Sequence, residues 1–385
     1  MEAAEKVEAS LNCSPDLVIC YYTDGYDADE LRQTLASVWP DAALHGGSTC
    51  RGVVLPRGWT SRDERVLALF ALSDPEGAYG AGSACLDSDA GYASATAVRM
   101  ALEHAGRPGE LPALIWLSTA PGEEEKVLEG LESAVGRNVP VLGGSTADNY
   151  LHGRWSQFSK DKACTNGVVV SVLFPTVELG YSYHNGYLPT TRTGTVTRGS
   201  GRILYSINGK PAAEVYNHWT GGLLKDTMLQ GGNILDKTSL FPLGRLHAWL
   251  ENVPLYILLH PERVNEDKSL SLFASIREGE TVALMRGNKE SLVRRAGRVA
   301  ESALAGLDEP PAEIKGGLVM FCAGSMLAIH QDIHDVYRSL GRVFGDAPYL
   351  CGFTFGEQGR LIDGSNQHGN LMISVVVFSD REAVF

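Results

Sequence analysis

The clearest pattern in the chain is an order of apolar and polar stretches that occurs three times. In its first copy, an apolar run at residues 17–22 precedes a polar turn and a helical stripe containing Leu31, Leu35 and Val38. A second short run ends in Gly46-Gly47-Ser48-Thr49, and an apolar run at residues 65–72 closes the copy. Short apolar runs are typical of strands, and apolar residues every three or four positions are typical of helices. Each copy therefore predicts a strand, a helix, a strand, a turn and a strand.

The other two copies lie at residues 114–174 and 318–378. The spacing between landmarks is 29 positions from residue 17 to residue 46, 29 from 114 to 143, and 34 from 318 to 352. Helical patterns at residues 88–104 and 291–304 precede the second and third copies. We therefore predict an α/β fold of mixed β-sheets with flanking helices, built from three repeated strand–helix–strand–turn–strand units in two lobes.

The stretch at residues 180–237 differs from the repeated units. It is rich in Gly, Thr and Tyr, and we expect loops there, with one short helix at Ala212–Trp219. Since Gly209-Lys210-Pro211 is a typical break between elements, we predict an N-terminal domain over residues 1–209 and a C-terminal domain over residues 210–385.

Composition excludes several classes of partner. The 385 residues carry 33 Lys and Arg against 46 Asp and Glu, a net charge of −13. An acidic surface repels nucleic acids and anionic membranes, so we expect neither as a partner. We find no apolar run near the ~20 residues that a transmembrane helix needs, and the first ten residues lack the features of a secretion signal. We therefore expect a cytoplasmic protein.

The seven cysteines follow no pairing pattern. Their number is odd and no Cys-x-x-Cys occurs, so we expect neither a disulfide framework nor a zinc ribbon. Several lie in apolar runs, where a free cysteine packs as a small hydrophobic residue.

Five strings resemble the FIST family, a sensory module of bacterial signalling proteins with an N-terminal and a C-terminal part. They are PVLGGSTAD at residues 140–148, GRILYSINGKPAAEVY at 201–216, FPLG at 241–244, CGFTFGE at 351–357 and NQHGN at 366–370. The resemblance covers almost the whole chain and follows the family's order. It departs at Gly324-Ser325-Met326, where members often carry an arginine after Cys-x-Gly.

The resemblance implies a sensor that binds a small molecule between its two lobes. It also implies a separate signalling partner, such as a histidine kinase or a diguanylate cyclase, because we recognise no output domain in the chain. One branch of the family looks like a haem-binding nitric-oxide sensor, which makes haem b a candidate cofactor here.

Three glycine-rich turns are the candidate ligand-binding elements. Each follows a predicted strand, and adjacent glycines let backbone N–H groups approach a ligand without interference from Cβ atoms. The residues concerned are Gly46, Gly47, Ser48, Thr49, Gly143, Gly144, Ser145, Thr146, Gly352, Thr354, Gly356 and Glu357. The alternative is that these are tight turns that bind nothing, with Glu357 as a buried acid satisfied by turn N–H groups.

An aromatic stretch around His184 is the candidate haem site. A neutral imidazole beside apolar and aromatic residues suits a haem iron, and Arg192 is placed to pair with a propionate or another carboxylate. The alternative role for His184 is a hydrogen bond to loop backbone.

Signatures of catalysis are missing from the sequence. We find no Gly-x-Ser-x-Gly elbow, no His-Glu-x-x-His and no cysteine signature with a placed histidine, so we expect a protein without enzyme activity. Two alternatives remain. One is an enzyme acting on a small carboxylate through Glu357 or Cys351, and the other is a protein-interaction scaffold.

Overall fold

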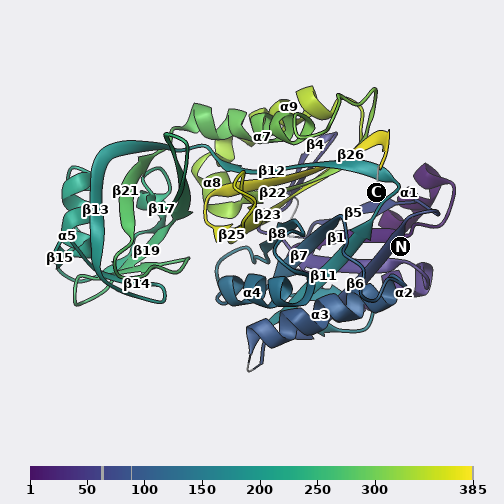
Figure 1. The fold of residues 1–385 in the computed structure, drawn as a ribbon, viewed down its shortest axis with the longest axis horizontal. Helices are drawn as coiled ribbons and strands as arrows, with labels where there is room; N and C mark the ends of the chain where they lie inside the picture. The colour runs from purple at the N-terminus through teal and green to yellow at the C-terminus, as the bar shows by residue number, and fades with distance from the viewer. Residues whose placement is uncertain (62–64, 88, 384–385) are drawn as a thin grey trace.

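The computed structural model describes residues 1–61, 65–87 and 89–383. It has a body made of the three repeated units and a lobe that projects from one side of it (Figure 1). Both the mixed sheets with flanking helices and the two lobes predicted from the sequence are confirmed. Ser88, the expected first residue of one helix, lies outside the described residues.

The three units share one arrangement. In each, a first strand pairs in parallel with the strand after its helix and antiparallel with the closing strand. The first unit contains β1 (Leu17–Tyr22), α2 (Ala28–Val38), β2 (Ala43–Ser48) and β5 (Leu67–Leu72), and the second contains β7 (Leu114–Thr119), α4 (Glu124–Val135), β8 (Val141–Ser145) and β11 (Gly167–Phe174). The third contains β22 (Ile314–Cys322), α8 (Ala323–Ala328), η1 (His330–Asp332), α9 (Ile333–Phe344), β23 (Tyr349–Thr354) and β26 (Met372–Glu382).

Each unit also contributes a hairpin that pairs with the sheet of another unit. The hairpin β3 (Val53–Leu55) and β4 (Gly58–Thr60) of the first unit extends the third sheet beside β23. The hairpin β9 (Gln157–Ser159) and β10 (Ala163–Cys164) of the second extends the first sheet beside β2. The hairpin β24 (Glu357–Arg360) and β25 (Asn366–Gly369) of the third extends the second sheet beside β8. This cyclic exchange holds the units together.

Alternate side chains of the first strands face two different cores. Leu17 and Ile19 of β1 join a central core with residues of all three sheets, whereas Val18 and Cys20 lie under the helices of their own unit. Burial on both faces explains why these strands are continuous apolar runs. The flanking helices are α1 (Glu2–Leu11) and α2 on the first sheet, α3 (Ala90–His104) and α4 on the second, and α7 (Lys289–Leu304) and α9 on the third. Strands β6 (Ala78–Cys85) and β12 (Val177–Asn185) border the second and third sheets.

The projecting lobe is inserted between β12 and α7, and it has its own apolar core. Its elements are β13 (Leu188–Ser200), β14 (Ile203–Ile207), β15 (Lys210–Pro211), α5 (Ala212–Trp219), β16 (Gly232–Asn233), α6 (Leu235–Thr238), β17 (Leu243–Leu250), β18 (Val253–Leu259), β19 (Pro261–Val264), β20 (Leu270–Leu272) and β21 (Thr281–Arg286). The domain boundary predicted at 209/210 falls inside this lobe, between β14 and β15.

The loops expected at residues 180–237 are in part strands, and that prediction was wrong for β12, β13 and β14. Most residues of β13 are exposed, so the strand lacks the alternation of apolar and polar residues that marks a half-buried strand. Its backbone pairs with β14 and β21 instead. The helix expected at Ala212–Trp219 is present as α5.

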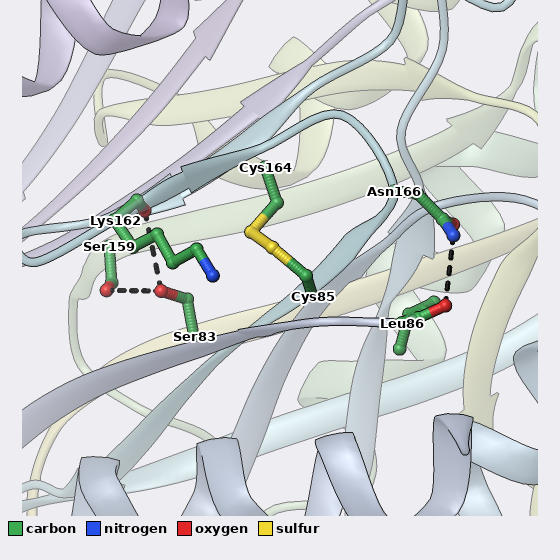
Figure 2. Close-up of a disulfide and its surroundings, with 7 residues drawn as sticks. All are labelled: Ser83, Cys85, Leu86, Ser159, Lys162, Cys164 and Asn166. Carbon is green, nitrogen blue, oxygen red and sulfur yellow. Dashed lines mark hydrogen bonds between the residues drawn. A yellow bond between two sulfur atoms is a disulfide. The ribbon is translucent and has the colours of Figure 1, made fainter. Parts of the chain in front are cut away.

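A disulfide joins Cys85 of β6 to Cys164 of β10, contrary to the expectation from cysteine spacing (Figure 2). The two residues are 79 positions apart, and they belong to sheets of different units. Beside the bond, the hydroxyls of Ser83 and Ser159 lie 2.8 Å apart. Local spacing could not reveal this pair because the exchange of hairpins brings it together. No helix within the described residues is long and apolar enough to cross a bilayer.

Candidate functional site

The three units meet where their second strands end, and there they form a closed ring of backbone hydrogen bonds. Equivalent residues of each unit donate an N–H to a carbonyl of another unit, at 3.0 Å in every case: Cys50 to Phe353, Ala147 to Ser48, and Phe355 to Ser145. The ring fixes the ends of β2, β8 and β23 against one another. It therefore sets the position of the residues that follow those strands.

The glycine strings predicted to be ligand-binding turns form part of this packed centre. Gly46 and Gly144 lie within β2 and β8, and an added Cβ would lie 2.2 Å from the Phe158 ring and 2.6 Å from Thr354 respectively. The N–H groups of the Ser and Thr that follow donate to protein carbonyls: Ser48 to Ser156, Thr49 to Tyr22, Ser145 to Gly356 and Thr146 to Thr119. These amides are thus used by the fold and are not open to a ligand.

A cavity of about 420 Å³ lies just beyond the ring, between the body and the inserted lobe. All three units and the lobe contribute to its wall. The residues include Cys50, Arg51, Asn149, Tyr150, Leu151, Cys322, Ala323, Gly324, Leu327, Ala328, Phe355 and Asn370 from the body, and Asn233, Leu235, Asp236, Ser239, His260 and Phe273 from the lobe. Volumes of about 300–1,000 Å³ with mainly apolar walls and a few polar groups are usual for small-molecule sites.

None of the twelve residues predicted as ligand contacts is among the residues that line this cavity. Cys50 and Phe355, which do line it, are two of the three donors in the ring: Cys50 directly follows a predicted string, and Phe355 lies between the predicted contacts Thr354 and Gly356. The sequence thus indicated the correct strand ends, but the wall is formed by residues a few positions further on. The resemblance had also singled out Gly324, which lines the cavity at the start of α8.

Two asparagines supply the buried polar groups of the wall. Asn149 Oδ1 accepts the Arg51 N–H at 2.6 Å, and Asn370 Oδ1 accepts the His260 N–H at 3.0 Å. Both side chains are almost fully buried, at 4% and 1% exposure. The Nδ2 group of each has no hydrogen-bond partner among the described residues. An unpaired buried N–H costs about 1–3 kcal/mol, so each of these asparagines leaves one donor that no described protein group satisfies.

His260 is the imidazole of the described wall. Burial lowers its pKa to about 4, so the imidazole is neutral at pH 7. Its Nε2 lies 3.4 Å from Ser239 Oγ, and its ring centroid lies 6.0 Å from that of Phe273. His260 and Phe273 therefore form an aromatic, uncharged patch on the lobe side of the wall.

Glu357 lies behind the wall and acts as a structural acid. It is fully buried, accepts hydrogen bonds from Thr354 Oγ1 at 2.8 Å and Met372 N at 3.0 Å, and burial raises its pKa well above the usual range. Burial therefore favours the neutral form of this carboxyl group. Burial also raises the pKa of Cys322, which keeps its thiol protonated.

A second polar cluster connects the lobe to the body near the cavity. Arg202 of the lobe lies 2.5 Å from Glu124 and 3.1 Å from Glu125, both at the start of α4, and Glu125 also accepts the Ser275 N–H at 2.7 Å. Burial acts to raise the pKa of Glu125, but the charges of His368 and Arg202 outweigh it and hold the pKa at about 2. Both carboxylates are thus ionised at neutral pH.

Arg192 and His184 lie away from the cavity. The Arg192 guanidinium donates to the carbonyls of His218 and Trp219 on the exposed side of the lobe. His184 lies on β12 opposite Ile373, and burial, with the charge of Arg295, lowers its pKa. The structure therefore does not bring these two residues together with the other predicted site residues.

Comparison with known proteins gives matches at the level of family and fold. Residues 16–210 match the model of the FIST N domain, and residues 212–360 match that of the FIST C domain. An uncharacterized protein of Methanocaldococcus jannaschii, MJ1623, is 28% identical over 179 residues, which cover 44% of this chain and 33% of that protein. The chain thus matches about a third of the length of this curated relative.

Two solved structures show distant likeness. Cyanuric acid hydrolase from A. caulinodans is 9% identical, with a TM-score of 0.39 over 98% of this chain and 94% of that one. PurLQS from Thermotoga maritima is 10% identical, with a TM-score of 0.24 over 80% and 73% of the two chains. The two domain matches together span most of the sequence, and the chain therefore belongs to the FIST family, with a FIST N domain followed by a FIST C domain.

Proposed function

We propose that this protein is a signal-transduction sensor that binds a small molecule in the cavity between the inserted lobe and the three-unit body. The observation that carries the proposal is the wall of that cavity, to which both lobes contribute and in which the Nδ2 groups of Asn149 and Asn370 have no protein partner. Membership of the FIST family supports a sensory role.

A ligand in this position acts on the arrangement of the two lobes. Because it contacts Phe273 and His260 on one side and Phe355 and Asn370 on the other, it stabilises the arrangement in which both sides are within reach. The change passes to a separate signalling protein, such as a histidine kinase or a diguanylate cyclase. Ligand and partner are then linked, so each raises the affinity for the other by the same factor.

The test is a substitution that fills the cavity without disturbing the buried core around it. Ala328 lines the cavity on α8 and is partly exposed, so Ala328→Phe adds a ring to the space while leaving the buried core in place. We expect the variant to lose the small molecules that mass spectrometry finds bound to the purified protein. Ala312→Phe, at an exposed position outside the cavity wall, is the matched control. Equal ligand content in the two variants and the natural protein would exclude the cavity as the sensory site.

Haem binding is a separate alternative, implied by the haem-binding branch of the family. His184 has the neutral imidazole that haem iron requires, but it is not among the cavity-lining residues, so the geometry of the cavity lends this alternative no support. An absorption spectrum with and without added haemin tests it. A Soret band that disappears in His184→Ala would establish haem ligation, and its absence would remove haem from consideration.

We further propose that binding occurs without turnover. In the enzyme alternative, Glu357 or Cys351 acts on a small carboxylate, but burial raises the pKa of both groups and neither lines the cavity. A buried acid or thiol that has a raised pKa and no access to a substrate is a poor base or nucleophile. Recovery of a chemically changed compound after incubation with the protein would contradict this proposal.

A further inference from the structure

The cavity offers more hydrogen-bond donors than acceptors to a ligand. The Nδ2 groups of Asn149 and Asn370 lack protein partners among the described residues, while the Oδ1 atom of each is already used by a backbone N–H. Each asparagine can therefore donate a hydrogen bond to a bound molecule through Nδ2, whereas its Oδ1 already accepts a hydrogen bond from the protein. A ligand that satisfies both must present oxygen acceptors.

One cationic side chain stands at the same wall. Arg51 lines the cavity, its side chain is exposed, and it forms no ion pair with any residue in the described parts of the chain. Its backbone N–H donates to Asn149 Oδ1 and its Nε donates to the main-chain carbonyl of Asn149, so the guanidinium lies beside this residue. The carboxylate among the described wall residues, Asp236, is exposed on the lobe side. The donors of the body thus form a positively charged end to the cavity.

The backbone at this end is held in an unfavourable conformation. Arg51 has φ 60° and Leu151 has φ 59°, and both line the cavity. Non-glycine residues in the left-handed region cost of order 1 kcal/mol or more, and such residues concentrate at ligand sites. Leu151, Leu327 and Phe355 contribute apolar side chains to the wall of the same cavity. The cavity therefore offers both polar and apolar contacts to a bound molecule.

Size limits the ligand further. A volume of about 420 Å³ corresponds to roughly 14 water molecules at about 30 Å³ each, which lies at the small end of the range for small-molecule sites. Because Arg51 supplies one guanidinium at this wall, a ligand with one negatively charged group matches it. A carboxylate also matches arginine's paired N–H groups and accepts further bonds from amides.

We propose that the cavity binds a small monocarboxylate with an apolar body, whose carboxylate is held by Asn149, Asn370 and Arg51. This inference rests on the proposed sensory role of the cavity and specifies the chemical class of its ligand. The apolar body packs against Phe273, Leu327 and Phe355. His260, neutral because of its burial, accommodates the body without competing for the carboxylate.

The test compares acids with neutral molecules of the same shape. The full-length protein is titrated calorimetrically with phenylacetate and 3-methylbutanoate, and with the corresponding amides. Compounds released from the protein as purified are identified by mass spectrometry. We expect the acids to bind at least tenfold more tightly than their amides, because the charge-assisted bonds to Arg51 are lost in the amides.

Three variants locate the head group. Arg51→Gln changes an exposed side chain, so it leaves folding intact, and we expect about tenfold weaker binding of the acids. Asn370→Asp keeps the oxygen that accepts the His260 N–H but replaces the donor with a negative charge, and we expect it to abolish binding of the acids. Arg338→Gln removes an exposed, surface-paired arginine on α9 and should leave affinity unchanged.

The outcomes separate the two proposals. Amides that bind as well as acids, or a released ligand without a carboxylate, would overturn the carboxylate assignment but leave the sensory cavity in place. If Arg51→Gln leaves the affinity for the acids unchanged while Ala328→Phe abolishes binding, the carboxylate assignment is also overturned and the sensory cavity again stays in place. If no probe binds and the purified protein releases nothing, both proposals fail.

Discussion

Loss of Arg202 should weaken the attachment of the inserted lobe to the body. Arg202 lies 2.5 Å from Glu124, whose side chain is 1% exposed, and 3.1 Å from Glu125. Removal of one partner of a buried ion pair costs about 3–5 kcal/mol, because the remaining charge is buried without compensation. Glu124 keeps hydrogen bonds from Gly122 N and Ser145 Oγ, each at 2.8 Å, so we expect Arg202→Met to destabilise the protein by about 2–3 kcal/mol.

A matched control is available within the same lobe. Lys268 forms an ion pair with Glu214 at 2.5 Å, but the two side chains are 46% and 43% exposed. Exposed pairs contribute about 0–1 kcal/mol, so Lys268→Met should have a small effect on unfolding. The double variant Arg202→Met/Glu124→Gln, which removes the buried charge as well, should recover much of the loss.

The assay is guanidinium unfolding followed by circular dichroism, with amide hydrogen exchange of β13–β21 to report on the lobe. Acid provides an independent check, since the pKa of Glu125 is lowered to about 2. A carboxylate with a lowered pKa contributes stability above its unfolded pKa of about 4.5, and this contribution is lost as the pH falls towards 2. An Arg202→Met variant that costs no more than Lys268→Met, or a double variant that loses the sum of both single effects, would show that the uncompensated charge of Glu124 is not the source of the loss.

Two further predictions concern the body. Gly143 has φ 153° and a Cβ there would lie 1.9 Å from the Leu117 carbonyl oxygen, so Gly143→Ala should cost about 3 kcal/mol or more in denaturant unfolding. Gly341→Ala, in open space within α9, should instead stabilise by about 0.5–1 kcal/mol, and similar effects of the two changes would contradict the packing argument. Burial lowers the pKa of His45 to about 3, so its stability contribution is complete above pH 6.5 and is lost as the pH falls towards 3. Between pH 7 and pH 5 the loss is about 2 kcal/mol. His45→Gln should remove this dependence, and identical slopes for the two proteins would show that the buried imidazole is not its source.

The sequence by itself determined the elements of the body and their repetition. Apolar runs such as residues 17–22 are buried on both faces, and their continuous pattern is therefore visible without a structure. The start of α2 is local as well: Asp27 is a residue type favoured at helix starts, and its side chain accepts the N–H groups of Asp29 and Glu30. Such signals are local, and they do not depend on which sheets meet.

Only the tertiary structure decided where the cavity lies and which residues form its wall. Gly46 was a reasonable ligand contact from its sequence, but Phe158 from a hairpin of another unit fills the space beside it. Arg51, Asn149 and Asn370 come from three different units, and His260 from the inserted lobe. A periodic pattern specifies how each strand is buried, but it contains no information about which sheet edge a hairpin joins. The exchange of hairpins and the insertion of the lobe therefore placed the site.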